Sequence, residues 1–319
     1  MVSAYRSGIN VKINGRIFLM SYIYPEPLKP GDRVCLIDPA NAYTDEALKT
    51  ASGYLTDKGF EIVVAEDMAF KRGTRWERAE RFNQVIRDPK NRGLICVWGG
   101  YGTMPLLDLI DYEAIRKNRP VFAGYSDNTA LHIAIGKKTG LITYHGPSFY
   151  SPSRPTTEEA KEFLVHMLTE FSANSAGKTR VCNLNSEEIE VIHGGCAKGQ
   201  LVGGNMTLVS RLMGTPYEID TKGKILFLEE IGEKPYRLHG MMTQLKMAGK
   251  LDEAAGIMMG SLNRCDDTER PGSGLLAVKD VLKDVEVPAV CNIRAGHVGD
   301  SLTLPLNAVV TIEGNQVTF

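Results

Sequence analysis

Residues 120–134, with the sequence PVFAGYSDNTALHIA, constrain the fold of this chain more than any other segment. Val121 to Ala123 is a short apolar run typical of a buried strand, and Ala130 to Ile135 supplies the apolar residues of a buried helix face. The segment between them leaves almost no room for a turn. A strand that enters a helix through so tight a corner pushes the corner side chain out above the sheet, as in a nucleophile elbow. Ser126 occupies that corner.

The motif around Ser126 also has an ordinary interpretation. Asn128 stands where the second glycine of Gly-x-Ser-x-Gly is normally found, so the match is incomplete. A serine or asparagine at a strand–helix junction often does no more than cap the helix. A nucleophile at Ser126 therefore requires a base and an acid elsewhere in the chain.

Length and charge exclude several classes of protein. The 319 residues are enough for two domains, each with its own core. A formal net charge of −1 gives no electrostatic basis for binding nucleic acid or an anionic membrane. No apolar run reaches the length of about 18 residues that a membrane span needs. We therefore predict neither nucleic acid nor membrane as a partner.

The cysteines and the N-terminus indicate a cytoplasmic protein. Six cysteines are scattered singly, without Cys-x-x-Cys spacing, and resemble small buried hydrophobic residues of a reducing compartment. The N-terminal segment lacks an uninterrupted apolar core followed by a small-residue cleavage site, so no signal peptide is expected.

The first half of the chain alternates short strands with helices, which predicts a parallel, doubly wound sheet. Strands are predicted at 33–37, 61–65, 93–97, 121–123 and near 141–144, and helices at 44–57, 74–86 and 104–110. The functional crevice of such a sheet lies beyond the carboxyl ends of its strands. Trp98 to Gly102 and Ser126 each follow a strand, so both are expected to open onto the same crevice.

The second half is richer in strands. A break at 151–157 and a helix at 158–171 precede it. Strands are predicted at 188–193, 198–202, 224–229, 255–259, 289–293 and 309–312, and helices at 205–213, 236–248 and 275–282. We expect a loosely attached extension at 1–27, a doubly wound domain at 28–150, a connector at 151–180, and a β-rich α/β domain of swivelling-barrel type at 181–319.

A serine nucleophile needs a general base, usually histidine, and a group that orients that base. His145 follows a strand of the first domain and could line the crevice. His297 lies between glycines in a loop after the predicted strand at 289–293, which places it to reach across an interdomain cleft. His132 and His166 are predicted to be packing or surface positions. A lone loop histidine is more often structural, so His297 needs support from other residues.

Glu229 and Glu230 are the candidate acids, because they follow the apolar run ILFL. A carboxylate at the end of a buried strand is unfavourable unless it is paired, which is a mild indication of function. The alternative is a strand that simply ends in solvent. Successive strand residues point to opposite faces, so at most one of the two can orient a base. No pair of residues has the spacing of metal ligands, and we expect no metal and no cofactor.

Taken together, these segments resemble the LD-carboxypeptidase family of serine peptidases, which includes the microcin C self-immunity proteins. The resemblance extends from Leu28 to the end of the chain. Its motifs are KPGD at 29–32, GGYG at 99–102, GYSDNTAL at 124–131, HGP at 145–147, GGN at 203–205, GTPY at 214–217, FLEE at 227–230, PYR at 235–237 and GH at 296–297. Each motif alone is weak, but their number and order are specific.

The resemblance implies a Ser–Glu–His triad formed by Ser126, Glu229 and His297, in that chain order. The first acid of the FLEE motif is the more regular one in the family, which favours Glu229 over Glu230. The implied oxyanion donors are the backbone N–H of Asp127, next to the nucleophile, and that of Gly100 in the Gly99–Gly100 turn. The nucleophile would come from the first domain and the other two residues from the second.

Two departures from the family pattern concern the substrate pocket. Trp98 stands where many members have arginine before Gly-Gly-Tyr-Gly, and His239-Gly240 stands where many have Asp-Arg. Trp98, Tyr101 and His239 are therefore our candidate substrate-binding residues. The cation that would bind a substrate carboxylate is left open among Arg75, Arg81, Arg237 and Arg294.

Three functions remain open at this stage. The family resemblance implies a serine LD-carboxypeptidase that releases the C-terminal D-alanine of murein tetrapeptides in cytoplasmic cell-wall recycling, and it suggests a homodimer. The second is an amidase of the microcin-immunity type that cleaves peptidyl-aminoacyl nucleotides. The third is a catalytically silent member that binds a peptide or nucleotide, for which only the altered pocket residues argue.

Overall fold

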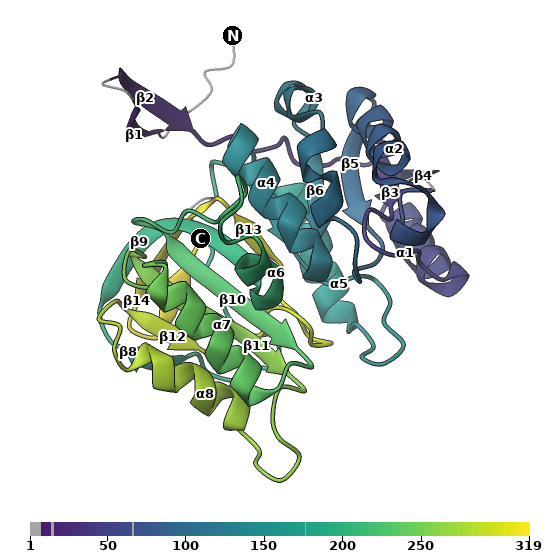
Figure 1. Cartoon of the computed structure of the whole chain (residues 1–319). Helices are drawn as coiled ribbons and strands as arrows, with labels where there is room; N and C mark the ends of the chain where they lie inside the picture. Colours follow the sequence, from purple (N-terminus) through teal and green to yellow (C-terminus); the bar gives the residue numbers. More distant parts are fainter. Residues whose placement is uncertain (1–7, 14–15, 66, 176) are drawn as a thin grey trace.

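The computed structural model describes the chain except residues 1–7, 14–15, 66 and 176. Two β-sheets form the body of the molecule, one of six strands and one of seven, and a separate two-stranded hairpin lies near the N-terminus (Figure 1). Helices cover both sheets. The expected α/β class, with two layered units in sequence, is confirmed.

The six-stranded sheet has the order β13-β7-β6-β5-β3-β4. Its first five strands in the chain are parallel, as predicted for a doubly wound sheet. They are β3 (Arg33–Ile37), β4 (Glu61–Ala65), β5 (Asn91–Cys96), β6 (Val121–Gly124) and β7 (Thr143–His145). The helices are α1 (Asp45–Asp57), α2 (Arg75–Arg87), α3 (Tyr112–Asn118), α4 (Thr129–Thr139) and α5 (Glu158–Glu170), with short 3-10 turns at η1 (Phe70–Arg72), η2 (Met104–Leu109) and η3 (Ser126–Asn128).

Alternate residues of β3 explain why helices lie on both faces of this sheet. Cys35 and Ile37 belong to one buried cluster, which includes residues of α2, α3 and α4. Val34 and Leu36 belong to the other, which includes residues of α1 and α5. Successive strand residues point to opposite faces, and a strand that is apolar on both faces must be covered on both.

The seven-stranded sheet has the order β15-β14-β9-β10-β11-β12-β8 and curls into a half-barrel (Figure 1). Its four central strands are parallel, and antiparallel strands close both edges. The strands are β8 (Glu190–His193), β9 (Cys196–Asn205), β10 (Ile225–Ile231), β11 (Gly256–Asn263), β12 (Ala289–Cys291), β14 (Val309–Glu313) and β15 (Gln316–Thr318). The helices are α6 (Met206–Arg211), α7 (Pro235–Met247) and α8 (Ser273–Leu282). The β-rich, barrel-like second unit is therefore confirmed.

Strand β13 (Leu304–Leu306) was not predicted, and it crosses between the two units. It pairs antiparallel with β7 at the edge of the first sheet, although in the chain it lies between β12 and β14 of the second sheet. Its three residues are too few to give a periodic pattern, and Pro305 argues against a strand. Proline is tolerated there because an edge strand has backbone positions that need no N–H donor.

The N-terminal segment contains a hairpin and is hydrogen-bonded to the first unit beyond it. The strands β1 (Gly8–Ile13) and β2 (Arg16–Ser21) form an antiparallel hairpin, and part of the predicted extension lies outside the described residues. Beyond the hairpin, Ile23 N–H donates to the Gly140 carbonyl at 3.0 Å and Leu28 N–H to the Leu168 carbonyl at 2.9 Å. These bonds fix the segment against the C-terminal ends of α4 and α5.

Two further expectations can be compared with the structure. Four of the six cysteines are buried, but Cys182 and Cys196 are exposed, which corrects the prediction that all six are small core residues. None of the helices within the described residues has the length and apolar character to cross a membrane.

Candidate active site

Ser126 occupies a strained corner between β6 and α4. Its φ of 62° lies in the left-handed region, which non-glycine residues rarely adopt and which clusters at functional sites. A Cβ on Gly124 would lie 2.9 Å from Cys96 Cβ, and a Cβ on Gly99 would lie 3.0 Å from Ser126 Oγ. Glycine is therefore required both before the corner and across from it, and the geometry is that of the predicted elbow.

Asn128 explains why the second glycine of the elbow motif is replaced. Its buried side chain donates from Nδ2 to the carbonyls of Trp98 and Tyr125, each at 3.1 Å. The amide thus ties the loop after β5 to the corner. Neither Ser126 nor Asn128 makes a side-chain capping bond to the helix. The capping interpretation left open by the sequence does not hold.

Glu229 and His297 form a buried pair beside this corner. His297 Nδ1 lies 2.7 Å from Glu229 Oε2, and the two residues are 4% and 0% exposed. Glu229 lies near the end of β10, and His297 lies in the loop that follows β12. Gly296 has a φ of 114°, and a Cβ there would overlap the Glu229 carboxylate. Glycine before the histidine is what allows the two side chains to meet.

The carboxylate of Glu229 is held in its charged form by the histidine. Burial alone would raise the pKa of Glu229, but the charge and the hydrogen bond of His297 hold this pKa below its usual value. The carbonyl of His297 accepts from Asn263 Nδ2 and from Arg154 Nη1, both at 2.6 Å. The backbone of the loop is therefore fixed from two sides.

Glu230 has a different role, as expected from strand alternation. Its Oε2 accepts from Thr207 N–H at 2.8 Å, and its Oε1 accepts from Asn205 Nδ2 and Ile231 N–H, each at 2.9 Å. Burial and the charge of Glu229 raise the pKa of Glu230. Glu230 thus holds the N-terminus of α6 and makes no contact with His297. Both glutamates are buried, so the alternative of a strand end in solvent is wrong.

The end of β9 joins the two sheets at this point. Asn205 N–H donates to Thr129 Oγ1 at 3.0 Å, which links the second sheet to the first turn of α4. A Cβ on Gly204 would lie 2.6 Å from the same oxygen, so the close approach requires glycine. The Gly-Gly-Asn motif therefore holds the serine and the Glu–His pair in one place.

Tyr125 connects the corner directly to the histidine, because its ring centroid lies 4.8 Å from that of His297. Ser126 is its immediate neighbour. Within the part of the chain that the structure describes, Ser126 Oγ makes no hydrogen bond to His297. Catalytic hydrogen bonds are often long or poorly aligned until substrate binds.

The glycine-rich loop after β5 packs against the corner through Asp127. Asp127 Oδ2 accepts from Thr103 N–H at 2.9 Å, and Thr103 Oγ1 donates to the Asp127 carbonyl at 2.7 Å. Burial raises the pKa of Asp127, although its bonds with Thr103 act in the opposite direction. Gly100 has a φ of 118°, and a Cβ there would lie 2.7 Å from Asn41 Cβ. The predicted oxyanion donors thus belong to one cross-linked unit.

Arg78 is a further residue that supports the site, and the sequence gives no indication of this role. It is 1% exposed and donates to the carbonyls of Pro39, Met68 and Gly102 at 2.9, 2.6 and 2.9 Å. These carbonyls follow β3, β4 and β5, so one buried guanidinium holds three loops at the carboxyl ends of the strands. In the sequence it is one of several charges on an amphipathic helix, and no signal separates it from the others.

The predicted substrate-binding residues are only partly brought together. Trp98 accepts from Asn128, and half-exposed Tyr101 packs edge-to-face on Phe70, so both lie in the loop next to Ser126. His239 lies elsewhere: it is half-exposed on α7, and its Nε2 is 3.5 Å from Asp280 Oδ2 on α8. No contact among the described residues connects His239 to the triad.

The four arginines proposed for carboxylate binding all have other partners. Arg294 binds Asp300 through two nitrogens, Arg81 lies 3.9 Å from Asp67, and Arg237 lies 3.5 Å from Glu233. Arg75 lies over the ring of its neighbour Trp76. Arg154, which does contact the triad loop, comes from the predicted connector and carries no sequence signal.

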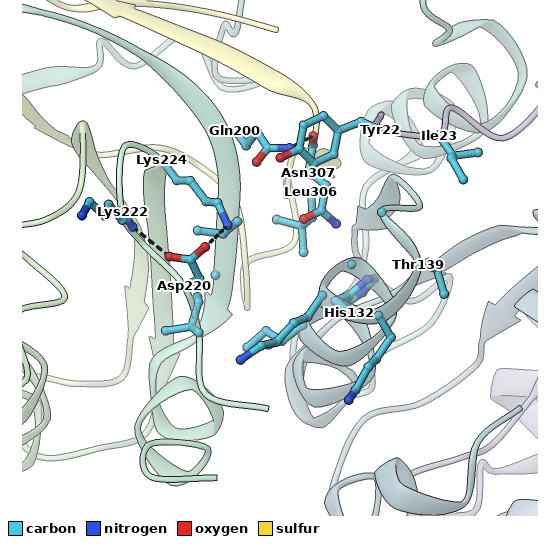
Figure 2. A pocket seen from close by; sticks show the side chains of 18 of the residues that line it. Tyr22, Ile23, His132, Thr139, Gln200, Asp220, Lys222, Lys224, Leu306 and Asn307 are labelled. Carbon is cyan, nitrogen blue, oxygen red and sulfur yellow. Dashed lines mark hydrogen bonds and ion pairs between the residues drawn. The ribbon is translucent and has the colours of Figure 1, made fainter. Parts of the chain in front are cut away.

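A cavity of about 600 Å³ lies apart from these residues, and neither Ser126, Glu229 nor His297 lines it (Figure 2). Tyr22 lies beside Gln200 on one side of it. On another side, Asp220 accepts from the backbone N–H of Lys222 at 3.2 Å and from Lys224 Nζ at 2.8 Å. No group of three or more His, Cys, Asp or Glu side chains in the described ranges could hold a metal ion.

A strained serine, a buried Glu–His pair and a loop of backbone donors can together carry out acyl transfer through a serine nucleophile. Two family models match the chain. The LD-carboxypeptidase N-terminal domain matches residues 34–146, and the LD-carboxypeptidase C-terminal domain matches residues 198–312. These matches define the class of protein as a two-domain peptidase.

The chain belongs to the LD-carboxypeptidase family. It is 35% identical to a probable murein peptide carboxypeptidase of Bacillus subtilis over 312 residues, which cover 95% of each chain. It is 26% identical to the microcin C7 self-immunity protein MccF of Escherichia coli, over 90% of this chain and 92% of that protein. A crystal structure of an MccF-like protein from Bacillus anthracis superposes with a TM-score of 0.79 at 26% identity, covering 93% of this chain and 99% of the other.

Proposed function

We propose that this protein is a serine LD-carboxypeptidase that hydrolyses an L,D-peptide bond and releases the C-terminal D-alanine of murein tetrapeptides. The main observation in favour is the buried Glu229–His297 pair beside a serine held at a φ of 62°. The name of the Bacillus subtilis relative supports the same substrate class. Cytoplasmic location and a homodimer, which the family resemblance suggests, remain predictions.

In the proposed mechanism, Ser126 Oγ attacks the carbonyl carbon of the L,D-bond while His297 Nε2 takes the hydroxyl proton. Glu229 holds Nδ1–H, which fixes the tautomer and stabilises the imidazolium. The N–H groups of Asp127 and Gly100 bind the oxyanion. His297 then protonates the leaving amine of D-alanine, and the C–N bond breaks to leave an acyl ester on Ser126. Water, deprotonated by His297, attacks this ester, and the proton returns to Ser126.

A second candidate is an amidase that cleaves peptidyl-aminoacyl nucleotides. It is favoured by the microcin C7 self-immunity relative and by Trp98, whose aromatic plane replaces the arginine fork of many family members. The third candidate is a silent member that binds its ligand without turnover. Against it stands the presence of all three triad residues.

The test is a D-alanine release assay on a murein L,D-tetrapeptide, with wild type beside Ser126→Ala. Ser52→Ala is a matched control, because Ser52 lies on α1 away from the triad. The proposal predicts release by wild type and by Ser52→Ala, and loss in Ser126→Ala. Release by Ser126→Ala at the wild-type rate would reject the nucleophile. No release by wild type would reject the murein substrate, and turnover of a peptidyl-aminoacyl nucleotide would then favour the second candidate.

A further inference from the structure

His145, the last residue of β7, is a buried histidine with no hydrogen-bond partner among the residues that the structure describes. It is 0% exposed, and its ring centroid lies 5.4 Å from that of Phe227 and 6.1 Å from that of His132. Neither of its ring nitrogens is bonded to any residue that the structure describes. Buried polar groups are nearly always paired in native structures. Packing against Phe227 alone therefore does not explain a histidine at this position.

The carboxylate of Glu229 has the complementary feature. Its Oε2 binds His297, but its Oε1 is buried and makes no hydrogen bond of ordinary geometry among the described residues. The side chain of Asn205, which donates to Glu230, also acts to lower the pKa of Glu229. His145 Nε2 lies 4.0 Å from this Oε1. A closure of about 1 Å would bring the two atoms to hydrogen-bond distance. The unbonded Nε2 of His145 and Oε1 of Glu229 are thus neighbours, and this Oε1 is the carboxylate oxygen that His297 does not bind.

We propose that His145 is a positioning residue for the triad acid, which in its neutral form directs Nε2–H toward Glu229 Oε1 while Oε2 binds His297. The inference rests on the proposed function, because it assigns His145 a role in the same triad. His145 touches neither substrate nor the reacting atoms. It acts through the carboxylate, which it keeps charged and oriented.

The surroundings keep His145 neutral. Burial lowers the pKa of His145 to about 4. The charge of Glu229 acts to raise this pKa, and His297 acts to lower it by a smaller amount. Among the described residues, the other titratable groups in ring contact with it are Tyr125, whose ring centroid lies 6.3 Å away, and His132. Near neutral pH, the charge that His145 meets is therefore that of the Glu229–His297 pair.

His132 is also neutral, and its proton can be assigned. Its Nε2 lies 2.9 Å from the Gly124 carbonyl, which can only accept, so Nε2 carries the proton. Its Nδ1 then accepts from Thr143 Oγ1 at 2.8 Å. Burial lowers the pKa of His132 to about 3. His132 lines the separate cavity shown in Figure 2, and its ring is tilted by 50° against that of His145.

A neutral donor at this position affects the base in a defined direction. With His297 unprotonated, the Glu229–His297 pair carries one negative charge, and this charge is lost when the pair binds a proton. An N–H directed at Oε1 favours the charged state. The pair therefore binds a proton less readily than it would without this donor.

The test follows the reaction of Ser126 with a fluorophosphonate as a function of pH, with the modified peptide identified by mass spectrometry. This reaction requires the base and not a particular peptide substrate. Replacing His145 by Phe removes the donor, and the acid limb of the rate profile should move to higher pH by up to about one unit. His145→Gln keeps an N–H at the same reach and should retain the wild-type limb. Each variant is first shown to be folded by its circular dichroism and thermal transition.

The outcomes separate the two hypotheses. A wild-type limb in folded His145→Phe would overturn the inference, and so would an equal shift in His145→Phe and His145→Gln, which would indicate a general packing effect. Should His145→Phe not fold, His145→Asn replaces it, because its shorter amide does not reach Oε1 and should show the same shift. Absence of labelling at Ser126 in wild type would reject the proposed function, and the inference with it.

A second measurement does not depend on reactivity. Long-range ¹⁵N–¹H spectra of histidine-labelled protein report which ring nitrogen carries the proton. At neutral pH we expect His145 to be neutral with its proton on Nε2, and its resonances to shift in Glu229→Gln. A proton on Nδ1, or a charged ring, would overturn the assignment.

Discussion

Replacement of Glu229 by Gln would keep the size of the side chain and remove the charge that His297 meets. The two side chains are buried and their atoms are 2.7 Å apart. At an effective dielectric constant of about 20, unit charges about 3 Å apart attract by about 5.5 kcal/mol. This energy is available only when the imidazolium forms, so its loss corresponds to about 10⁴ in rate. Loss of the correct histidine tautomer in a serine triad has an effect of about the same size.

Glu230→Gln is the matched control, because Glu230 is the next residue, equally buried, and has no contact with His297. Its two oxygens accept three hydrogen bonds, and an amide can accept at only one of them. A buried bond lost at the other should reduce the free energy of unfolding by about 1–3 kcal/mol. The activity of the folded variant should stay within about tenfold of wild type.

The assay is D-alanine release measured as kcat/KM, with urea unfolding of each variant in parallel. Glu229→Gln should be folded and inactive, and Glu230→Gln should be less stable and active. The assignment of the acid would be refuted if Glu229→Gln kept activity within tenfold of wild type. It would also be refuted if Glu230→Gln, shown to be folded, lost activity to the same extent.

Three further predictions concern the surroundings of the triad. Gly296→Ala should reduce the free energy of unfolding by at least about 1–3 kcal/mol from backbone strain alone. Gly240→Ala, in open space on α7, should increase it by about 0.5–1 kcal/mol. Equal effects of the two substitutions in urea denaturation would show this wrong. Burial raises the pKa of Asp38 to about 6 from its usual 3.8, so its contribution to stability is present at low pH and lost as pH rises through 6. Asp38→Asn should match wild type near pH 4 and exceed it by about 3 kcal/mol above pH 6, and a difference that does not vary with pH would show this wrong. Arg154→Met removes a charged donor from the carbonyl of His297 and should lower kcat/KM by about tenfold, while an unchanged value would show that Asn263 alone fixes the loop.

The order of strands and helices could be predicted because most elements carry their own local signal. The helix α2, for example, begins with a capping box formed by Thr74 and Glu77. Strand β13 has no such signal, because it is defined by its hydrogen bonds to β7, and β7 lies far away in the chain. Pairing between distant segments is not encoded in any window of sequence.

The residues of the site also divide into those with a local sequence signal and those that depend on distant contacts. Ser126 could be recognised from the tight corner, because strand, corner and helix are contiguous. The choice between Glu229 and Glu230 depended on the family resemblance, since alternation shows that one faces the histidine but not which one. Arg154 and Arg78 act through backbone carbonyls of distant loops, and no residue pattern indicates such a partner. His145 was expected at the crevice, and the structure places it fully buried behind Glu229.

Trapping the acyl-enzyme tests directly whether Ser126 is the nucleophile. Wild-type protein is mixed with a murein L,D-tetrapeptide, quenched in acid during turnover, and digested for mass spectrometry. We expect an adduct on Ser126 with the mass of the substrate less D-alanine, together with release of free D-alanine, and neither in Ser126→Ala. Release of D-alanine without an adduct on Ser126, and undiminished in Ser126→Ala, would contradict this expectation.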